Sequence, residues 1–339
     1  MMPRLAFGPW GESMAELRAA ATDAESHGAD SLWVSELQRT SFVQAAAIAM
    51  STSRVPIGTA LALAFVRSPF TTAMTALDLD ELSGGRFILG LGTGVKRLNE
   101  DWHMRPYPPP APHLRETVTL IRQLMTDVFR GVPITFEGTY ERVRIRGFER
   151  PYPPARPEIP IYVGGMGPAT LRLAGEIADG WIAHELCSPR YLAERALPRL
   201  RSGLTKAGRD RAALTVMASA CCLPSSDVRS ARRHAAGLVA FYATVRTYED
   251  FFDFHGFRAE AAAIRERFIA GDVAGMIAAC PDEMVDALTL VGTPDSILRR
   301  LREYEGLADV VKLTPPTHHV PPEVTRESQA ATIALLGSD

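Results

Sequence analysis

The chain has 339 residues and a net charge of −2, and its lysines and arginines are dispersed along the sequence. This balance argues against a nucleic-acid partner, which selects for clustered basic residues. Hydrophobic residues make up 46% of the chain, enough for a sizeable core. Because no apolar stretch approaches transmembrane length and the start lacks a signal-peptide core, we expect no membrane partner.

Cysteine and histidine spacing argues against a metal centre. The histidines show no His-Glu-x-x-His pattern, and no Gly-x-Ser-x-Gly or phosphate-binding Gly-x-x-x-x-Gly-Lys motif is present. Cys221 and Cys222 are neighbours in an apolar run, and Cys187 and Cys280 stand alone. Buried thiols in a cytoplasmic protein are therefore expected.

Short apolar runs alternate with helical patterns along the chain. The predicted strands are 4–7, 31–34, 55–61, 86–91, 159–163, 180–183, 214–223 and 307–313. The predicted helices are 14–27, 42–50, one opening at 69, 113–129, 169–177, 191–207, the region 227–289, and 322–336, with a hairpin at 134–145. The first strands recur at about 25–30 residues, the length of a βα unit, which indicates a parallel sheet.

Eight strands, seven of them clearly followed by helices, predict an α/β protein with the (β/α)8 barrel fold rather than an open sheet. We expect one domain over residues 1–339. The excess over the roughly 250 residues typical of this fold lies at about 100–156, after the fourth strand, and 244–289, after the seventh. Active sites of such barrels collect at the carboxyl ends of the strands.

The most informative stretch surrounds the fourth strand. A helix ends on Gly84-Gly85, because glycine adopts the left-handed conformation that closes helices. The apolar run 86–91 reads as a buried strand, and it leads into Gly92-Thr93-Gly94, a turn thin enough for a ligand to touch the backbone. Taken alone, these last glycines are equally compatible with an ordinary βα turn.

As a whole, this stretch resembles the flavin- and deazaflavin-dependent luciferase-like family, in which a helix ending in Leu-Ser-Gly-Gly-Arg and a strand ending in Gly-x-Gly recur at the fourth barrel strand. The resemblance runs from Leu5 to about Leu313. The chain is most similar to oxidoreductases that use the deazaflavin coenzyme F420. This implies hydride transfer between the deazaflavin C5 and a small organic substrate bound over the ring, in a protein that commonly forms homodimers.

Two other functions, one of them not catalytic, fit the same resemblance. An FMN-dependent monooxygenase of this fold would activate oxygen with reduced flavin. A barrel that binds a ligand without catalysis is the third reading, because two family positions are altered: Leu37 stands where deazaflavin enzymes often have histidine, and Val95 where their glucose-6-phosphate dehydrogenases have an acidic glutamate. The second change argues against the sugar-phosphate reaction.

Glu36 and His184 are the candidate catalytic residues. Glu36 follows the second strand, where a carboxylate in an apolar barrel mouth can act as acid, base or hydrogen-bond acceptor. Its alternative is an exposed loop glutamate. His184 follows the sixth strand and is either a proton carrier or a structural histidine. His318 and His319 follow the eighth strand and are weaker candidates.

The resemblance also implies the cofactor contacts. The strand-three segment carries a non-prolyl cis peptide in deazaflavin enzymes, which by match is Ala60–Leu61, behind the middle ring; the alternative is a regular strand end. The loop from Gly164 to Thr170 matches the holder of the phosphate tail, and free N–H groups at a helix start beside glycines suit an anion. The complete predicted set is Ala60, Leu61, Leu63, Thr93, Gly94, Lys96, Asn99, Gly164, Gly165, Met166, Gly167, Ala169 and Thr170.

Two of these predictions carry conditions. Asn99 matches a cofactor-contacting asparagine only if one residue is inserted, and Lys96 is either a holder of an acidic group or a solvated loop lysine. Trp33, Phe65 and the aromatic run 251–254 are candidate walls of a substrate pocket, or core residues. The substrate itself depends on loops whose shape the sequence leaves open.

Overall fold

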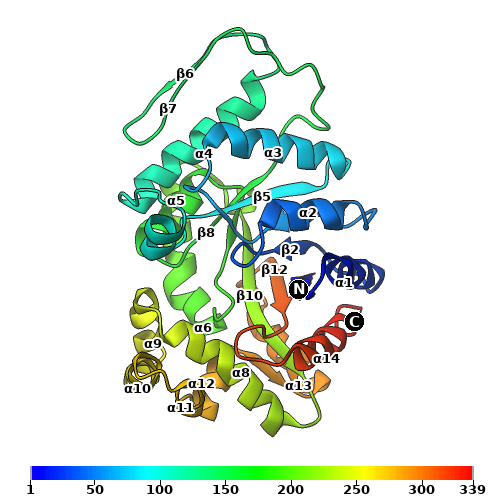
Figure 1. Cartoon of the computed structure of the whole chain (residues 1–339), viewed down its shortest axis with the longest axis vertical. Coiled ribbons are helices and arrows are strands. Elements are labelled where there is room, and N and C mark those ends of the chain that lie inside the picture. Colours follow the sequence, from blue (N-terminus) through cyan, green and yellow to red (C-terminus); the bar gives the residue numbers. More distant parts are fainter. Residues whose placement is uncertain (1, 338–339) are drawn as a thin grey trace. The chain divides into compact units, whose positions relative to one another are not determined.

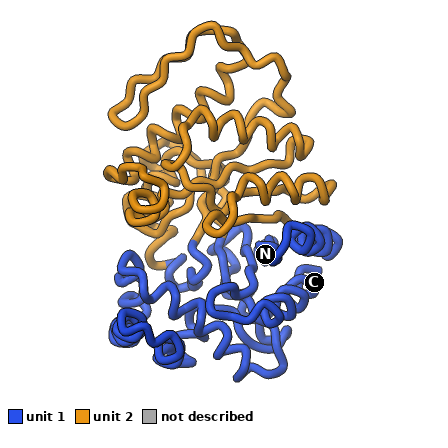
Figure 2. Tube along the Cα trace, in the orientation of Figure 1, with its two compact units in different colours: residues 1–29, 184–193, 218–339 blue, residues 30–183, 194–217 orange. Residues whose placement is uncertain are grey.

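The structure is a computed structural model that describes residues 2–337, and the chain divides into two compact units (Figure 2). Unit 1 contains the residues up to 29, residues 184–193 and the residues from 218 onward. Unit 2 contains residues 30–183 and 194–217. The single domain expected from the sequence stays a prediction.

Unit 2 is a parallel sheet with a helix after most strands (Figure 1). Its strand order is β2-β3-β5-β8-β9, and β9 also pairs with the first residues of β10. The strands are β2 (Leu32–Val34), β3 (Ile57–Thr59), β4 (Ala62–Leu63), β5 (Phe87–Gly92), β8 (Ile161–Gly164), β9 (Gly180–Ile182) and β10 (Thr215–Pro224). The helices are α2 (Ser41–Ala49), α3 (Pro69–Leu82), α4 (Pro110–Asp127), α5 (Pro168–Ile177) and α7 (Leu197–Lys206), with a π-helical turn η1 (Leu98–Trp102) and the hairpin β6 (Ile134–Glu137) and β7 (Arg142–Ile145).

Unit 1 contains the remaining strands, β1 (Arg4–Phe7), β11 (Leu290–Gly292) and β12 (Val310–Thr314), with most of β10. Its helices are α1 (Met14–Ser26), α6 (Pro189–Tyr191), α8 (Val228–Ala243), α9 (Glu249–Phe254), α10 (Arg258–Ile269), α11 (Val273–Ala278), α12 (Asp282–Leu288), α13 (Pro294–Leu301) and α14 (Pro322–Ile333). The strand order within this unit is β11-β10-β12-β1.

The order of the parallel strands along the chain, and the helices between them, are those of a (β/α)8 barrel, which confirms the predicted fold class. Residues 100–156 hold the end of η1, the helix α4 and the β6–β7 hairpin, whose antiparallel pairing was also predicted. Residues 244–289 hold α9 to α12. That these segments are insertions stays a prediction.

Three details differ from the sequence-based expectations. The predicted strand 55–61 ends at Thr59, because the chain bulges at Ala60 before pairing with β5 again as β4. The helical region 227–289 is broken into separate helices, with turns at Gly256 and Gly271, which both have positive φ. The three-residue strand β11 was not predicted, since so short an apolar run carries no measurable period.

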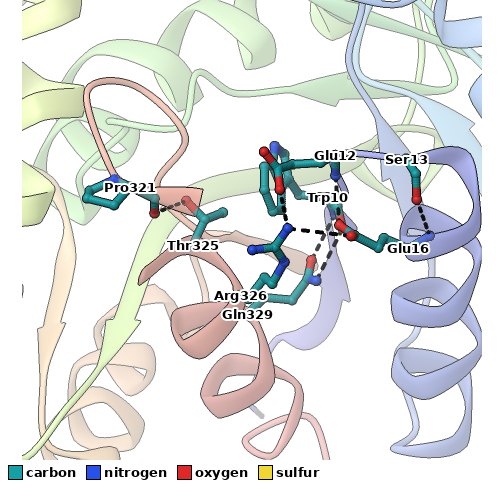
Figure 3. Close-up of polar contacts among 8 residues, drawn as sticks. All are labelled: Trp10, Glu12, Ser13, Glu16, Pro321, Thr325, Arg326 and Gln329. Atoms are coloured by element: carbon teal, nitrogen blue, oxygen red, sulfur yellow. Dashed lines mark hydrogen bonds and ion pairs between the residues drawn. The ribbon is translucent and has the colours of Figure 1, made fainter. Parts of the chain in front are cut away.

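In unit 1, α14 holds the loop that follows β1 (Figure 3). The Gln329 side chain accepts a hydrogen bond from the Trp10 N–H at 2.8 Å and donates one to the Trp10 carbonyl at 3.2 Å. One turn earlier, Arg326 pairs with Glu12 and lies 3.4 Å from a carboxylate oxygen of Glu16. The last described helix therefore fixes the exit of the first strand.

In unit 2, the Leu-Ser-Gly-Gly-Arg motif is a structural clamp. Gly84 and Gly85 have φ of 66° and 82° and end α3. The Arg86 guanidinium then donates to the carbonyl oxygens of Ala49, Thr52 and Val55 at 3.1, 3.1 and 2.8 Å. One side chain thus satisfies three carbonyl groups of the segment between α2 and β3.

We expect Arg86→Met to lower the free energy of unfolding by about 3 kcal/mol, because it leaves those carbonyl groups without a donor. The matched control is Arg18→Met, which removes an exposed arginine of α1 and should change stability by less than about 0.5 kcal/mol. Urea denaturation of both variants measures the difference. Equal stabilities would show that Arg86 is not a clamp.

Candidate active site

In unit 2, Glu36 is tied to the segment that follows β3. One carboxylate oxygen accepts the Leu63 N–H at 2.7 Å and an Arg67 N–H at 3.0 Å, and the other oxygen accepts a second Arg67 N–H. The Glu36 side chain is only 6% exposed, so it is not a solvated loop glutamate. The exits of the second and third predicted barrel strands are therefore joined through this carboxylate.

The peptide bond between Ala60 and Leu61 is cis, as the resemblance implied. The Leu61 side chain fills the space beside two glycines. A methyl group placed on Gly92 would lie 2.6 Å from Leu61 Cδ1, and one placed on Gly164 would lie 2.1 Å from it. The ends of β5 and β8 thus meet around one leucine, and only residues without a side chain fit there.

The exit of β5 is folded back on itself by Asn99. This side chain is fully buried, and its amide donates to the carbonyl groups of Thr93 at 2.9 Å and Val95 at 3.0 Å. Its amide oxygen, Oδ1, has no hydrogen-bond partner among residues 2–337. Tyr107 donates to the Gly94 carbonyl at 2.9 Å, so the turn is held from both sides.

Leu63 and Lys96 are two further predicted cofactor contacts near the turn that follows β5. A methyl group on Gly94, which has a φ of 63°, would lie 2.9 Å from Leu63 Cδ2. Leu63 is therefore packed against the turn. Lys96 is largely exposed, and its ammonium lies 3.8 Å from a carboxylate oxygen of Glu100.

The exit of β8 leads directly into α5. The Gly165 carbonyl accepts a hydrogen bond from Trp181 Nε1 at 2.9 Å, and Gly165 has a φ of 155° with the Thr170 side chain beside it. Pro168 begins α5 without an N–H to satisfy, and the N-cap residue, Gly167, has no side chain that could cap the helix. The first N–H groups of α5, which include that of Ala169, therefore have no side-chain acceptor on the N-cap residue. Met166 and Gly167 lie in the connection between strand and helix.

In unit 1, His184 follows β9 and packs against two tyrosines that also contact each other. Its ring centroid is 4.2 Å from that of Tyr242 and 4.6 Å from that of Tyr248. His184 Nδ1 accepts the Leu186 N–H at 3.2 Å, which places the proton of the neutral ring on Nε2. His184 Nε2 is buried and has no hydrogen-bond partner among residues 2–337.

Glu185 is a residue that the sequence analysis did not single out. Tyr242 donates to one carboxylate oxygen and Thr314 to the other, at 3.2 Å. Burial alone would raise the pKa of Glu185, but His184, Lys312 and the Tyr242 hydroxyl outweigh it and hold this pKa below its usual value. Two polar residues in a row after an apolar strand were the signal for it.

Lys312 was also missed, since it lies inside the predicted eighth strand rather than after it. It is only 8% exposed in β12, and burial lowers the pKa of its ammonium, against the opposing effect of Glu185. His318, one of the weaker candidates, has a pKa lowered by burial and stacks on Phe241 with centroids 4.0 Å apart. His319 is exposed.

The aromatic residues predicted as possible walls of a substrate pocket have different surroundings from one another. Trp33 is 3% exposed and donates from Nε1 to Ser31 at 2.8 Å, which makes it a core residue. Phe251 and Phe252 are buried at 5% and 1% exposure and belong to the core of unit 1. Phe65 stacks on His113 with centroids 3.9 Å apart.

Residues 2–337 contain neither a membrane-spanning helix nor a cluster of metal-binding side chains. None of their helices combines the length and the apolar character needed to cross a membrane. No group of three or more His, Cys, Asp or Glu side chains among them is arranged to hold a metal ion.

The chain matches the family model for luciferase-like monooxygenases over residues 4–309. It is 30% identical over 305 residues to 5,10-methylenetetrahydromethanopterin reductase of Archaeoglobus fulgidus, covering 86% of this chain and 87% of the relative. It is 30% identical over 324 residues to a putative coenzyme F420-dependent oxidoreductase of Mycobacterium tuberculosis, covering 89% of this chain and 91% of that one.

Among solved structures, the coenzyme F420-dependent tetrahydromethanopterin reductase of Methanopyrus kandleri superimposes with a TM-score of 0.83 at 23% identity, covering 99% of this chain and 98% of that one. This likeness shows the barrel fold. The chain belongs to the luciferase-like monooxygenase family. The family expected from the sequence is therefore confirmed, and the relatives bear the names of oxidoreductases, the enzyme class that was expected.

Because His184 is buried and neutral, the stability of the folded protein should depend on pH. Burial lowers its pKa from 6.5 to about 4, so between these pH values the unfolded chain binds a proton that the folded chain does not. The folded state should therefore lose stability as the pH falls through this interval, by up to about 3 kcal/mol. We expect His184→Gln to remove this loss, measured by urea denaturation at several pH values.

His27→Gln, in the exposed residue that follows α1, is the control and should keep the wild-type dependence on pH. Parallel curves for the wild type and His184→Gln would contradict the assignment of a neutral, buried His184.

Proposed function

We propose that this protein is an F420-dependent oxidoreductase, which transfers a hydride between the deazaflavin C5 and a small organic substrate bound over the ring. The observation that carries the proposal is the convergence in unit 2 of the exits of β2, β3, β5 and β8 on Leu61, Leu63 and their neighbours. The names of the relatives support the choice of cofactor.

The residues of unit 2 fit such a cofactor in two respects. Asn99 Oδ1 is a buried acceptor that lacks a donor, as expected of an atom that completes its hydrogen bonding with a ligand. The uncapped N-terminus of α5, reached through Gly165 and Gly167, offers backbone N–H groups to a phosphate. When bound, the deazaflavin supplies the carbon that gives or takes the hydride.

In this proposal the segment Ala60–Leu61 backs the middle ring, and Leu63 and Thr93 to Gly94 border it. Glu36 acts as a hydrogen-bond acceptor that positions this segment through the Leu63 N–H, since both of its oxygens are occupied. The cofactor's phosphate tail lies on the loop Gly164, Gly165, Met166, Gly167, Ala169 and Thr170, and Lys96 is an exposed cation for an acidic group.

His184 is the proposed proton carrier, because it holds a proton at Nε2, which is buried and has no partner among residues 2–337. Leu37 stands where the family often has a histidine after the second strand, and it cannot carry out the proton transfer of that histidine. The protein's contribution is then positioning, exclusion of water and one hydrogen-bond donor.

Titration of the purified protein with F420 and with FMN tests the proposal. We expect the visible spectrum and fluorescence to report binding of F420 in preference to FMN. Tight binding of FMN with consumption of oxygen by the reduced complex would instead show a flavin monooxygenase. Binding of F420 whose redox state never changes with any electron donor would show a barrel that only binds.

Gly167 offers a sharper test of the phosphate site. It is the residue before α5, has a φ of −68° that any residue adopts, and an added methyl group would meet nothing within 4 Å. Gly167→Asp should cap the helix and preserve stability, but its carboxylate should repel the phosphate tail. We expect F420 to bind about tenfold to a hundredfold more weakly, measured by fluorescence titration.

Gly167→Ser is the matched neutral control, because serine caps equally well without a charge. It should bind F420 within about threefold of the wild type. If both variants bind F420 as the wild type does, the tail does not lie at α5.

A further inference from the structure

In unit 2, the tip of the β6–β7 hairpin is docked on α4 by one carboxylate of that helix. The two oxygens of Glu116 accept the backbone N–H groups of three consecutive residues, Thr139 to Glu141, at 2.9, 2.7 and 3.0 Å. Burial alone would raise the pKa of Glu116, but the three donors, together with nearby His113, outweigh it and hold this pKa below its usual value. Glu116 is therefore ionised at neutral pH and holds the tip through charge-assisted hydrogen bonds.

The hairpin tip can receive this carboxylate because Gly138 has no side chain. A methyl group at Gly138 would lie 2.2 Å from Glu116 Oε2, far inside the van der Waals distance. The Gly138 N–H donates to the Glu141 carbonyl at 2.9 Å and closes the turn of the hairpin. The glycine thus makes the room that the Glu116 carboxylate fills.

The same tip orients His113, which lies one turn before Glu116 on α4. The Glu141 carboxylate accepts a hydrogen bond from His113 Nε2 at 2.8 Å, and Thr117 Oγ1 lies 3.0 Å from the same oxygen. His113 Nδ1 is buried and has no hydrogen-bond partner among residues 2–337. Glu141 is therefore the hydrogen-bonding group that sets the orientation of this imidazole.

From His113, a series of contacts leads to the turn that follows β5. The His113 ring is stacked on Phe65 with centroids 3.9 Å apart, and Phe65 meets the Tyr107 ring edge-on at 6.1 Å. The Tyr107 hydroxyl donates to the Gly94 carbonyl at 2.9 Å. Phe65 also follows Leu63 by two residues, and Leu63 packs against Gly94. The rings of His113, Phe65 and Tyr107, here called the ring stack, thus join the hairpin tip to this turn.

The turn at Thr93 and Gly94 borders the cofactor in the proposed function, whereas the hairpin contains none of the predicted cofactor contacts. We propose that Glu116 and Glu141 are positioning residues for the cofactor, because the docked tip holds the ring stack against this turn. This inference rests on the proposed function, since it assigns further residues to the binding of the same cofactor.

A coupling of this kind is reciprocal. If the docked tip favours the form of the turn that binds the cofactor, binding of the cofactor must favour docking by the same factor. The amide hydrogens of residues 139–141 report docking directly, because their N–H groups are the ones bonded to Glu116. They exchange with solvent when the tip leaves α4, so docking can be measured without turnover.

The first experiment undocks the tip in two independent ways. Glu116→Met removes the carboxylate that holds the tip, and Gly138→Ala places a methyl group where that carboxylate lies. In the apoprotein, the amides of residues 139–141 should exchange at least about tenfold faster in both variants. F420 should bind to each variant about fivefold to tenfold more weakly than to the wild type, measured by fluorescence titration.

Glu137→Met is the matched control, because Glu137 is an exposed residue of the same hairpin whose carboxylate pairs with Arg142 and Arg144. It should bind F420 within about twofold of the wild type, since exposed ion pairs contribute little. Unchanged amide exchange in Glu116→Met and Gly138→Ala, or faster exchange with wild-type affinity for F420, overturns the inference.

The second experiment tests whether the ring stack carries the effect. Phe65→Leu removes the stacking but leaves Glu116 and the docked tip in place, so the amides of residues 139–141 should exchange as in the wild type. The double variant Glu116→Met/Phe65→Leu should bind F420 no more weakly than Phe65→Leu alone. Additive losses would mean that the two residues act separately, and they overturn the inference. If Phe65→Leu does not fold, Tyr107→Phe replaces it in the cycle, because it removes only the hydrogen bond to Gly94.

The third experiment measures the reciprocal effect in the wild-type protein. Saturation with F420 should slow the exchange of the amides of residues 139–141 by about the factor that undocking costs in affinity, fivefold to tenfold. Binding of F420 with no change in this exchange overturns the inference and leaves the proposed function intact. Failure of the wild type to bind F420 at all would overturn the proposed function itself, so the two failures are distinguishable.

Discussion

The contact on which the rest of the unit 2 site depends is the packing of Leu61 against Gly92 and Gly164. Because both glycines lack a side chain, one leucine brings the ends of two strands within van der Waals distance of the segment after β3. Glu36 fixes the same segment through a hydrogen bond from the Leu63 N–H. The exits of four successive barrel strands are joined by one packing contact and one carboxylate.

The glycine-rich motifs of this chain divide into two physical kinds. Gly84-Gly85 serves architecture: it ends α3 and presents Arg86 to three carbonyl groups. Gly164 and Gly165 instead make room, the first for the Leu61 side chain and the second for the Thr170 side chain. Motifs of similar composition therefore have different purposes, and only the neighbours of each glycine distinguish them.

The sequence predicted the features that repeat or have a strong local cause. The alternation of strands and helices, the hairpin at 134–145 and the helix start at Pro168 all follow from spacing and from residues that start or stop elements. The convergence around Leu61 was predicted from the barrel rule, without the contact that produces it. Lys312 was missed because a buried lysine inside a strand has no local signature, and the charge of Glu185, which influences its pKa, lies far away in the chain.

The pairing of β1 with β12 has a consequence for how the chain acquires its structure. Arg4 to Phe7 lie beside Val310 to Leu313, and α14 then fastens the loop at Trp10. During synthesis β1 therefore emerges long before β12, and it stays without this neighbour until residues 310–313 have been made. Fragments that stop short of residue 310 would leave the β12 edge of β1 unpaired, and an open strand edge promotes association between chains.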